Sequence, residues 1–446
     1  MALGNIDRHG GVPTVRLESV ALSTFMKFLR NLILGITAVS AVLYGFRLWE
    51  MRDPHPSERI GRGTIAIQGA RIYTSPDAPP IEHGTVLVRD GIIAAVGSEV
   101  TVPSDARILP CNACTVTAGF WNAHVHFTEP KWDSAAWKDP VTLNAQLADM
   151  LTSRGFTTVV DAGSDLAHTI SLRRRIERGE LLGPRIYTAG SGLYPPHGIP
   201  YYLKDALPFF VQWALPTPST PQEAAKDEER SIARGADLLK LFTGSYVARG
   251  HVLPMPEDIA AAAVKVAHDH RQIAYSHPSN LAGTQVAIAS GVDVLAHAPD
   301  TTEDIDAALL GSMVSRQMAM IPTLKMFATT VTTKPEYLLP IYAEVRQFHE
   351  LGGTLMFGTD VGYMTDYKTE DEFLALQQSG LNMHDMLRML TTAPAERFRV
   401  ADKRGTVAVG KMGDLTVLDA DPANDVTAFA RVSVTVRNGE VIYQKR

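Results

Sequence analysis

Cysteine is almost absent from this sequence of 446 residues, which contains only Cys111 and Cys114. A framework of disulfides, the usual support of small secreted domains, is therefore excluded. Charge of one sign is also scarce. The net charge is −6 and no segment carries a basic stripe, so nucleic acid is not an expected partner. Only one long apolar run occurs, which excludes a protein made mainly of membrane-spanning helices. The length suits one large domain and a smaller one.

The two cysteines form a C-x-x-C pair in a turn just before a predicted strand. A redox or metal role would need a helix N-terminus or a second pair of ligands nearby, and the sequence offers neither. We expect a reduced turn, with a small local disulfide as the alternative in an oxidising compartment.

The apolar run extends from Asn31 to Phe46 and follows the basic residues Lys27 and Arg30. A spanning helix needs roughly 17–25 apolar residues and a signal core roughly 7–15, so this run falls between them. A buried core helix is the other interpretation, but no partner elements lie nearby in the sequence. We expect an export signal or a membrane anchor within an N-terminal tail, residues 1–60. The rest of the chain would then lie outside the cytoplasm, in a bacterial periplasm; a cytoplasmic location stays open.

Strand-like segments occupy residues 61–116 and, again, residues 400–446. They are β-branched and apolar, and two of their connections carry the hairpin signals Asp90-Gly91 and Asn438-Gly439. We expect the two pieces to form one composite β-sandwich domain from both chain ends. Its predicted strands are Thr64–Tyr73, Gly84–Val88, Ile92–Val96, Asp414–Leu418, Val432–Val436 and Val441–Tyr443.

The middle of the chain, residues 117–399, alternates strand and helix signals, which indicates a parallel sheet. The predicted strands are Thr117–His126, Phe156–Gly163, Arg185–Gly190, Asp237–Phe242, Gln272–His277, Val292–His297, Ala319–Leu324 and Thr354–Asp360. Eight strands over this length predict an α/β fold, a (β/α)₈ TIM barrel. The segment Ser191–Thr220 has six prolines and is long for a plain connection, so we expect a lid or substrate loop there.

Residues that can bind metal gather at the ends of these predicted strands. Because active sites of such barrels lie at the carboxyl ends of the strands, the residues there should converge on one rim. They are His124, His126, Lys240, His277, His297 and Asp360. Alone, each has an ordinary explanation, such as a hydrogen-bonded histidine, a solvated lysine or a helix-capping aspartate. Their joint occurrence predicts a metal site.

Several motifs of this chain resemble those of the amidohydrolase superfamily. The segment from Thr117 to His126 resembles its first-strand signature, and Gly235 to Lys240 resembles the strand that carries a carboxylated lysine. The Gly358-Thr359-Asp360 segment and the Gly410 to Leu415 segment are similar to later motifs. The resemblance covers residues 64–446 and is nearest to the imidazolonepropionase-like branch, which includes exported prolidase-type dipeptidases.

The resemblance implies two divalent metal ions; the ligands suit Zn²⁺, and Mn²⁺ or Co²⁺ stays open. His124, His126 and Asp360 would hold one ion, His277 and His297 the other, and carboxylated Lys240 would bridge them. It implies hydrolysis of a C–N amide-type bond in a peptide, an N-acyl amino acid or a cyclic amide. A metal-bridging hydroxide would attack, with Asp360 as general acid and base. Alternatives are a lactone or phosphoester hydrolase, a mononuclear deaminase, and a membrane-tethered binding protein without catalysis.

Substrate contacts are expected from loops that follow the strand ends, because loops at this barrel face often carry function. The candidates are Tyr194, His197, Tyr246, Arg249, His251, Lys325 and Tyr363. Tyr246 or Arg249 could bind a substrate carboxylate. The expected partner is a small molecule, with a membrane tether through residues 31–46, and association into a homo-oligomer stays open.

Overall fold

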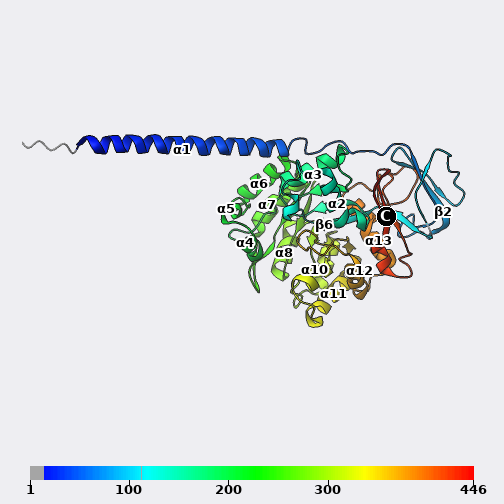
Figure 1. The fold of residues 1–446 in the computed structure, drawn as a ribbon. Coiled ribbons are helices and arrows are strands. Elements are labelled where there is room, and N and C mark those ends of the chain that lie inside the picture. The colour runs from blue at the N-terminus through cyan, green and yellow to red at the C-terminus, as the bar shows by residue number, and fades with distance from the viewer. Residues whose placement is uncertain (1–14, 112, 446) are drawn as a thin grey trace, which may run out of the picture. The chain divides into compact units, whose positions relative to one another are not determined.

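The computed structural model describes residues 15–111 and 113–445. Contacts divide the chain into two compact units, Met1–Arg52 and Asp53–Arg446. In the first, α1 (Val15–Glu50) is one continuous helix (Figure 1). Its part from Phe25 to Glu50 is long and apolar enough to cross a membrane, and the predicted apolar run lies within it. By length and composition, α1 suits a signal or a membrane anchor.

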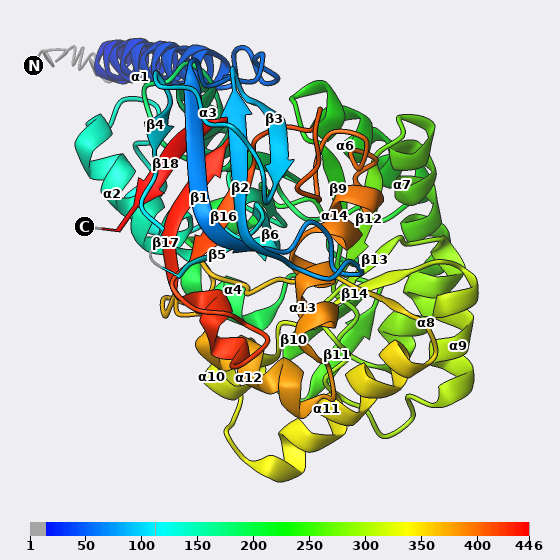
Figure 2. The ribbon, with the colours of Figure 1, turned by 90° about the vertical axis from the view of Figure 1, so that its right-hand side faces the viewer.

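The second unit contains a sheet that joins both ends of the chain. Its strand order is β18-β17-β16-β5-β1-β2-β3, with β4 paired to β1. Figure 2 shows the early strands and the late strands side by side. Within the sheet, the strands from the two ends pair through the antiparallel neighbours β5 and β16. The strands are β1 (Thr64–Ile72), β2 (Ile81–Arg89), β3 (Ile92–Gly97), β4 (Arg107–Ile108), β5 (Thr115–Ala118), β16 (Leu415–Leu418), β17 (Val432–Arg437) and β18 (Glu440–Gln444). Both ends therefore meet in one continuous sheet.

Both predicted hairpin turns are present in this sheet. Asp90 and Gly91 connect β2 to β3 with φ values of 47° and 81°. Asn438 and Gly439 connect β17 to β18 with φ values of 48° and 77°. Two consecutive positive φ angles are the mark of a type I′ turn, which Asp-Gly and Asn-Gly adopt at little cost.

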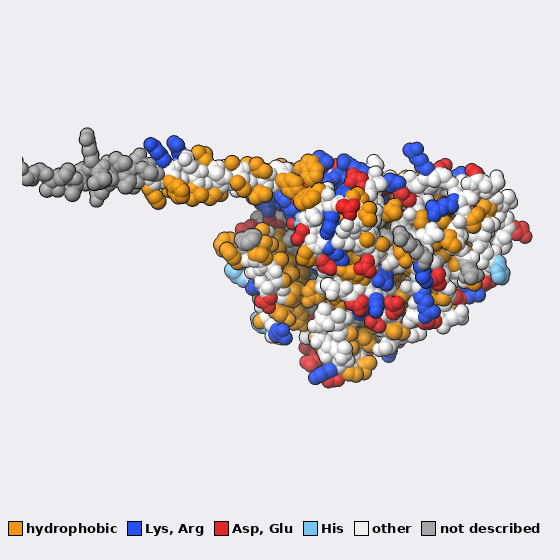
Figure 3. All heavy atoms as spheres, in the orientation of Figure 1, with side chains coloured by type: hydrophobic (Ala, Val, Ile, Leu, Met, Phe, Trp, Pro, Cys, Tyr) orange, Lys and Arg blue, Asp and Glu red, His pale blue; other side chains and the backbone are white. Residues whose placement is uncertain are grey.

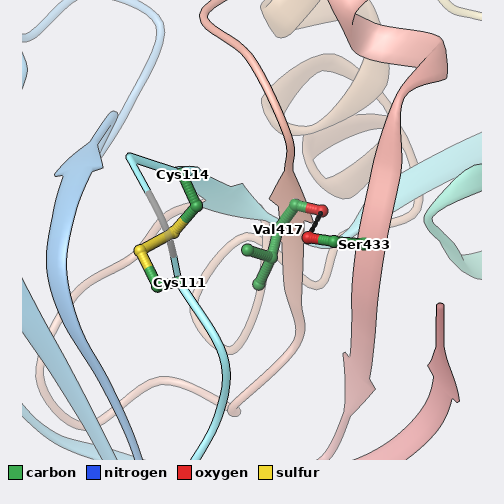
Figure 4. Close-up of a disulfide and its surroundings, with 4 residues drawn as sticks. All are labelled: Cys111, Cys114, Val417 and Ser433. Carbon is green, nitrogen blue, oxygen red and sulfur yellow. Dashed lines mark hydrogen bonds between the residues drawn. A yellow bond between two sulfur atoms is a disulfide. The ribbon is translucent and has the colours of Figure 1, made fainter. Parts of the chain in front are cut away.

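The prediction of a reduced turn at the cysteine pair is wrong, because Cys111 and Cys114 form a disulfide (Figure 4). The turn brings their Cα atoms to 5.0 Å, within the range that a disulfide requires. Cys114 is buried in the hydrophobic core of the sheet. The pair thus closes the loop that leads into β5, and no free cysteine is found in the described residues.

A TIM-barrel-like α/β fold makes up the rest of the second unit. Three parallel strands form one sheet, in the order β6-β7-β8, and five form another, in the order β15-β14-β13-β12-β9. The strands are β6 (Phe120–Val125), β7 (Phe156–Asp161), β8 (Arg185–Thr188), β9 (Leu238–Leu241), β12 (Ile273–Ser276), β13 (Val294–Ala296), β14 (Ala319–Ile321) and β15 (Thr354–Leu355). Backbone hydrogen bonds connect the two sheets at both gaps, from Ala123 to Phe357 and from Asp237 to Thr188, each 2.7 Å long.

The predicted first barrel strand, Thr117–His126, is in fact two strands. β5 belongs to the end sheet and β6 to the barrel, and the chain changes direction at Gly119. A Cβ atom at Gly119 would lie 2.4 Å from the Thr157 hydroxyl oxygen, so only glycine fits where β6 approaches β7. One continuous apolar run in the sequence therefore contains two strands, which belong to different sheets.

Helices follow the barrel strands, as the alternation of strand and helix signals predicts. They are α2 (Pro140–Met150), α3 (Leu166–Glu177), α6 (Pro221–Ala233), α7 (Glu257–Asp269), α8 (Leu281–Ser290), α9 (Ala307–Ser315), α11 (Pro335–Glu350), α12 (Glu370–Gln378) and α13 (Met383–Leu390). The predicted Ser191–Thr220 loop contains two short helices, α4 (Tyr201–Ala206) and α5 (Phe209–Gln212). The sequence also did not predict the hairpin β10 (Gly244–Ala248) and β11 (His251–Pro254), or α10 (Leu324–Thr330) and α14 (Thr392–Arg397).

Glu58 and two buried arginines connect the first residues of the second unit to its sheet and barrel. Glu58 forms ion pairs with Arg185 of β8 and with Arg404, and its carboxylate accepts a hydrogen bond from Asn438. Burial opposes ionisation of Glu58, but Arg185, Arg404 and Arg437 outweigh it and hold its pKa at about 2. These contacts, together with three hydrophobic clusters drawn from residue 65 onward, make Asp53–Arg446 a unit with its own core.

Candidate metal centre

All six predicted ligand positions lie at or just beyond the carboxyl ends of parallel strands. His124 is in β6, and Lys240 is in β9. The others follow a strand by one to five residues: His126 after β6, His277 after β12, His297 after β13 and Asp360 after β15. The barrel-like arrangement turns the ends of these five strands toward one region, as the alternating pattern predicts.

Three ligand atoms of this group converge on one point. The Nε2 atoms of His124 and His126 are 3.2 Å apart, and they lie 3.3 Å and 2.9 Å from Oδ1 of Asp360. Atoms that share a metal ion at about 2.0–2.2 Å are themselves about 3 Å apart, so this spacing fits one ion. The Oδ1 atom of Asp360 is buried and has no hydrogen-bond partner in the described part of the chain. Its lone pairs are therefore available to a cation.

The second side of the centre is formed by His277, His297 and Lys240. The ring of His297 lies 4.6 Å from that of His124 and 4.7 Å from that of His277. One ligand atom each from His124, His297 and Asp360 lies within 4.8 Å of the others. The Lys240 ammonium is buried. It lies 5.4 Å from the centre of the Phe242 ring, which stacks on the ring of His277. Imidazole nitrogen and carboxylate oxygen are ligands that suit zinc and similar divalent ions.

Hydrogen bonds outside the centre fix the orientation of two imidazoles. Nδ1 of His126 lies 2.6 Å from the carbonyl oxygen of Gly163, which can only accept, so Nδ1 carries the proton. The Thr323 hydroxyl donates to the carbonyl of Pro322 and therefore accepts from Nδ1 of His297, 2.6 Å away. In both residues Nε2 is left unprotonated, with a lone pair for a metal ion.

The backbone is held in unusual conformations at two of the ligands. His297 has a φ of 108° and Asp360 a φ of 58°. Such values are uncommon for residues other than glycine and cost of order 1–3 kcal/mol each, so the surrounding structure must impose them. This strain lies at the two ligands that belong to the buried three-residue cluster, as is frequent at functional sites.

Burial and mutual repulsion keep most of these groups uncharged or unprotonated. Desolvation, helped by the Lys240 charge, lowers the pKa of His124 and of His277 to about 3. Burial likewise lowers the pKa of His297 well below its usual value. Burial alone would raise the pKa of Asp360, but its contacts with His124 and His126 hold that pKa well below the usual range. At His126 burial also opposes protonation, but the contact with Asp360 and the Asp161 charge outweigh it and raise the pKa. Three of the four imidazoles are therefore held in the neutral form that binds a metal ion, beside one carboxylate.

We expect the metal-free protein to lose stability as the pH falls below about 6.5, the usual histidine pKa. The unfolded imidazoles bind protons there, whereas folded His124 and His277 remain neutral down to about pH 3. Each contributes up to about 1.4 kcal/mol per pH unit to the lost free energy of unfolding. Urea unfolding of chelator-treated protein at several pH values measures this slope. His277→Gln should flatten the slope, and His251→Gln, at an exposed position, should not; equal slopes in all three proteins would contradict this assignment.

Two glycines allow β6 and the chain after β15 to approach each other at the centre. A Cβ atom at Gly358 would lie 2.9 Å from Cβ of His124. At Gly362, where φ is 99°, it would lie 1.8 Å from the carbonyl oxygen of His126. Both contacts are on the segment that carries Asp360, so the close approach brings that carboxylate to the two imidazoles.

Gly362→Ala should therefore lower the free energy of unfolding by about 2–3 kcal/mol and weaken metal binding, because the backbone must move to relieve the contact. Gly311→Ala is the matched control, since a Cβ atom there meets nothing within 4 Å. It lies inside α9 and should leave stability unchanged or raise it by up to about 1 kcal/mol. Denaturant unfolding and metal titration of both variants test this. Equal effects at the two positions would show that the approach is not tight.

The structure distributes the predicted substrate contacts unevenly. Tyr194 is buried, and its ring lies 4.6 Å from the Phe242 ring, which stacks on His277. Tyr363 follows Asp360 closely, and burial and the Asp360 charge raise its pKa. The remaining loop candidates are His197, Arg249 and His251, which are exposed; Tyr246, which is half-buried; and Lys325, which is buried in an ion pair with Asp366.

Sequence patterns did not identify an acidic group beside Tyr246. The Tyr246 hydroxyl donates to both carboxylate oxygens of Asp300, at 2.7 and 2.8 Å, and Tyr337 donates to the same group at 3.1 Å. Asp300 follows β13, three residues after His297, so its position beyond a strand end was the available signal. Burial raises the pKa of Asp300.

Comparisons with known proteins show what the chain as a whole is similar to. A family model described as "Amidohydrolase family" matches residues 115–442. Ochratoxinase of Aspergillus niger is 21% identical over 410 residues, which cover 82% of this chain and 83% of that protein. Among solved structures, a putative prolidase from Bifidobacterium longum is 24% identical with a TM-score of 0.71, covering 86% of this chain and 96% of that one. A Xaa-Pro dipeptidase with bound methionine in its active site is 21% identical with a TM-score of 0.72, covering 86% of this chain and all of that one.

Proposed function

The chain belongs to the amidohydrolase family and is a hydrolase of C–N bonds, and we propose that it works with two divalent metal ions held at the candidate metal centre. The observation that carries the proposal is the convergence of His124 Nε2, His126 Nε2 and Asp360 Oδ1 within 2.9–3.3 Å, beside two further imidazoles. The family is generally metal-dependent, and these donors fit Zn²⁺. His124, His126 and Asp360 would hold one ion, and His277 and His297 the other.

Lys240 would bridge the two ions after reaction with CO₂. Carboxylation needs a neutral amine, and burial lowers the pKa of Lys240 to about 7, so a large share of the amine is neutral at physiological pH. No carboxylate of the described residues lies within ion-pair distance of its Nζ to hold it protonated. The product would carry one negative charge and two oxygen atoms, whereas a protonated lysine would repel cations.

When bound, the ions would supply a water molecule of lowered pKa and polarise the carbonyl group of the substrate. The Oδ1 atom of Asp360 lies 2.9 Å from Nε2 of His126, and the carboxylate is ionised at neutral pH. Asp360 can therefore accept the proton of the attacking water. It would then deliver that proton to the leaving nitrogen of the amide. General acid and base action of this kind contributes about 10²–10⁴-fold to rates.

The substrate would be a small amide, such as a peptide, an N-acyl amino acid or a cyclic amide, and the named activities of ochratoxinase and the prolidase-like structures support this class. Two candidate contacts are supported by their neighbours: Tyr194 packs on the Phe242 ring that stacks on His277, and Tyr363 follows Asp360 by three residues and feels its charge. A substrate carboxylate at Tyr246 would compete with Asp300, so Arg249 is the better candidate for that role. His197, His251 and Lys325 remain predictions as substrate contacts.

The domain division that accompanies this proposal has a signal or anchor tail at residues 1–60, a composite β-sandwich domain built from 61–116 and 400–446, and a (β/α)₈ barrel over 117–399. We propose a location outside the cytoplasm. The apolar helix α1 and the disulfide between Cys111 and Cys114 support it, because disulfides persist in oxidising compartments.

A substrate panel tests the proposed bond type. The full chain would be assayed with dipeptides, N-acyl amino acids and cyclic amides, with lactones and phosphoesters as the contrasting classes and with free purines for deamination. We expect hydrolysis in the amide group, abolished by a chelator and restored by Zn²⁺. Turnover of lactones or phosphoesters alone would overturn the amide assignment while leaving the metal centre intact.

A further inference from the structure

The segment between β8 and α6 exposes a group of large apolar side chains. Phe209 and Trp213 are 65% and 82% exposed, and their rings pack edge to face at 5.3 Å. Ala206, Pro208 and Ala214 beside them are exposed too. We call these five residues the α5 face. Figure 3 shows hydrophobic side chains gathered where Figure 1 places α4 and α5.

No ionisable residue occurs between Ala206 and Pro216, and Gln212 is the one polar residue of that stretch. A contiguous apolar surface with a tryptophan at this exposure is rare on a freely soluble surface and marks a contact with another phase or molecule. Charged residues begin just before it, at Lys204 and Asp205, which are exposed. The pattern is an apolar tip with polar residues at its base.

The same segment also reaches toward the metal centre. The Tyr202 ring of α4 lies 5.7 Å from that of Tyr363, and burial together with the charges of Tyr194, Tyr363 and Asp360 raises its pKa well above the usual value. The Ser245 hydroxyl of β10 donates to the carbonyl of Gly198 and fixes the start of the segment to the barrel. The α5 face is thus carried by a segment that also contacts Tyr363, three residues after the ligand Asp360.

We propose that the α5 face docks into the surface of a lipid bilayer. Phenylalanine and tryptophan are the side chains that settle at the boundary between headgroups and acyl chains, and shallow insertion of about 5–10 Å suits a short helix with aromatic residues at its tip. The chain itself supplies the second argument. α1 is apolar enough to lie in a membrane and ends at Glu50, and the unit with the metal centre begins at Asp53. A membrane that holds α1 therefore keeps the second unit within reach of its surface.

Docking of this kind would set the mouth of the metal centre beside the lipid. Docking to lipid does not depend on the bond that the enzyme cleaves. An experiment can therefore contradict membrane docking without contradicting the proposed amide hydrolysis.

Vesicle binding by residues 53–446, which form a unit with their own core, removes the contribution of α1. The protein would be mixed with vesicles of phosphatidylcholine and phosphatidylglycerol, and the bound fraction measured by flotation. We expect binding, and a loss of about tenfold in the partition coefficient when Phe209→Glu and Trp213→Glu are combined, because insertion strength follows the buried apolar area. Val409→Glu is the matched control: Val409 is 64% exposed, lies just before β16, and its replacement should change nothing. Absence of binding, or equal binding by the double variant, would overturn the proposal.

A second measurement uses the full chain and does not rely on the fold of the double variant. The chain has no free thiol among its described residues, so Trp213→Cys or Val409→Cys introduces a single site for an environment-sensitive dye. In the same vesicles the dye at position 213 should shift to the blue and be shielded from an aqueous quencher, and the dye at position 409 should not. Equal quenching at both positions would overturn the proposal. So would a dimer in lipid-free solution that dissociates in the double variant, since the α5 face would then contact a second copy of the chain.

Discussion

Asp360→Asn should lower kcat by about a thousandfold while the purified protein keeps most of its metal. Asparagine retains an oxygen ligand of the same reach, but it cannot accept the proton of the attacking water, and general acid and base catalysis of this kind is worth about 10²–10⁴-fold. The other ligands stay in place, because His124 and His126 belong to β6 and its end, and His126 is oriented by Gly163 rather than by Asp360 alone. Steady-state kinetics on the best amide substrate, with metal analysis of the same preparation, measures both parts.

Asp366→Asn is the control for this variant. Asp366 lies six residues further along the chain, is about half exposed and pairs with Lys325, which is not among the proposed metal ligands. Lys325 is buried but also donates to the backbone carbonyls of Asp366 and Lys368, and asparagine keeps a side-chain oxygen beside it, so the fold should be retained. We expect kcat to stay within a few-fold, and a contact of Lys325 with the substrate would change KM instead. If Asp360→Asn kept more than a tenth of the activity, the proton transfer would belong to another group.

Lys240→Met should remove about one metal ion per chain and lower kcat by about a thousandfold or more. Methionine preserves the apolar length of the side chain in its buried position, so the fold should be retained, but it can supply neither the charge nor the oxygens of a carbamate. The free energy of unfolding should not fall, because burial disfavours the charged lysine in the metal-free protein.

Acetate provides a test that a merely structural role for Lys240 would not satisfy. A small carboxylate can enter the space left by the carbamate and present two oxygens, so it should restore part of the activity of Lys240→Met in the presence of Zn²⁺. The matched comparison is Lys325→Met, at another buried lysine, where Nζ pairs with Asp366 and acetate should have no effect on activity. Two ions and full activity in Lys240→Met would contradict the bridging role.

The sequence predicted the parallel strands and most barrel helices because alternation of buried strands and amphipathic helices is a local signal. All six ligand candidates followed from one rule, that strand ends of such folds meet at one face. The strand from Thr117 to His126 was misread because an apolar run does not show where a chain passes from one sheet to another. The switch at Gly119 depends on the contact with Thr157, 38 residues later in the chain.

Other features escaped prediction because distant contacts create them. The α4 and α5 helices and the β10–β11 hairpin are too short for periodicity to identify, and their stability comes from packing on the barrel mouth. Asp300 accepts hydrogen bonds from Tyr246 and Tyr337, which are 54 and 37 residues away in sequence. The positive φ angles of His297 and Asp360 also have no sequence signal, because residues other than glycine adopt them under tertiary constraint.

The measurement that bears most directly on the binuclear centre is the number of metal ions per folded chain. The protein would be purified without chelators and analysed by mass spectrometry of its metals, with protein concentration from amino-acid analysis. Two zinc-like ions per chain, falling to about one in Lys240→Met, is the predicted result. One ion per chain in the unsubstituted protein, unchanged by added Zn²⁺ and bicarbonate, would contradict the two-metal account.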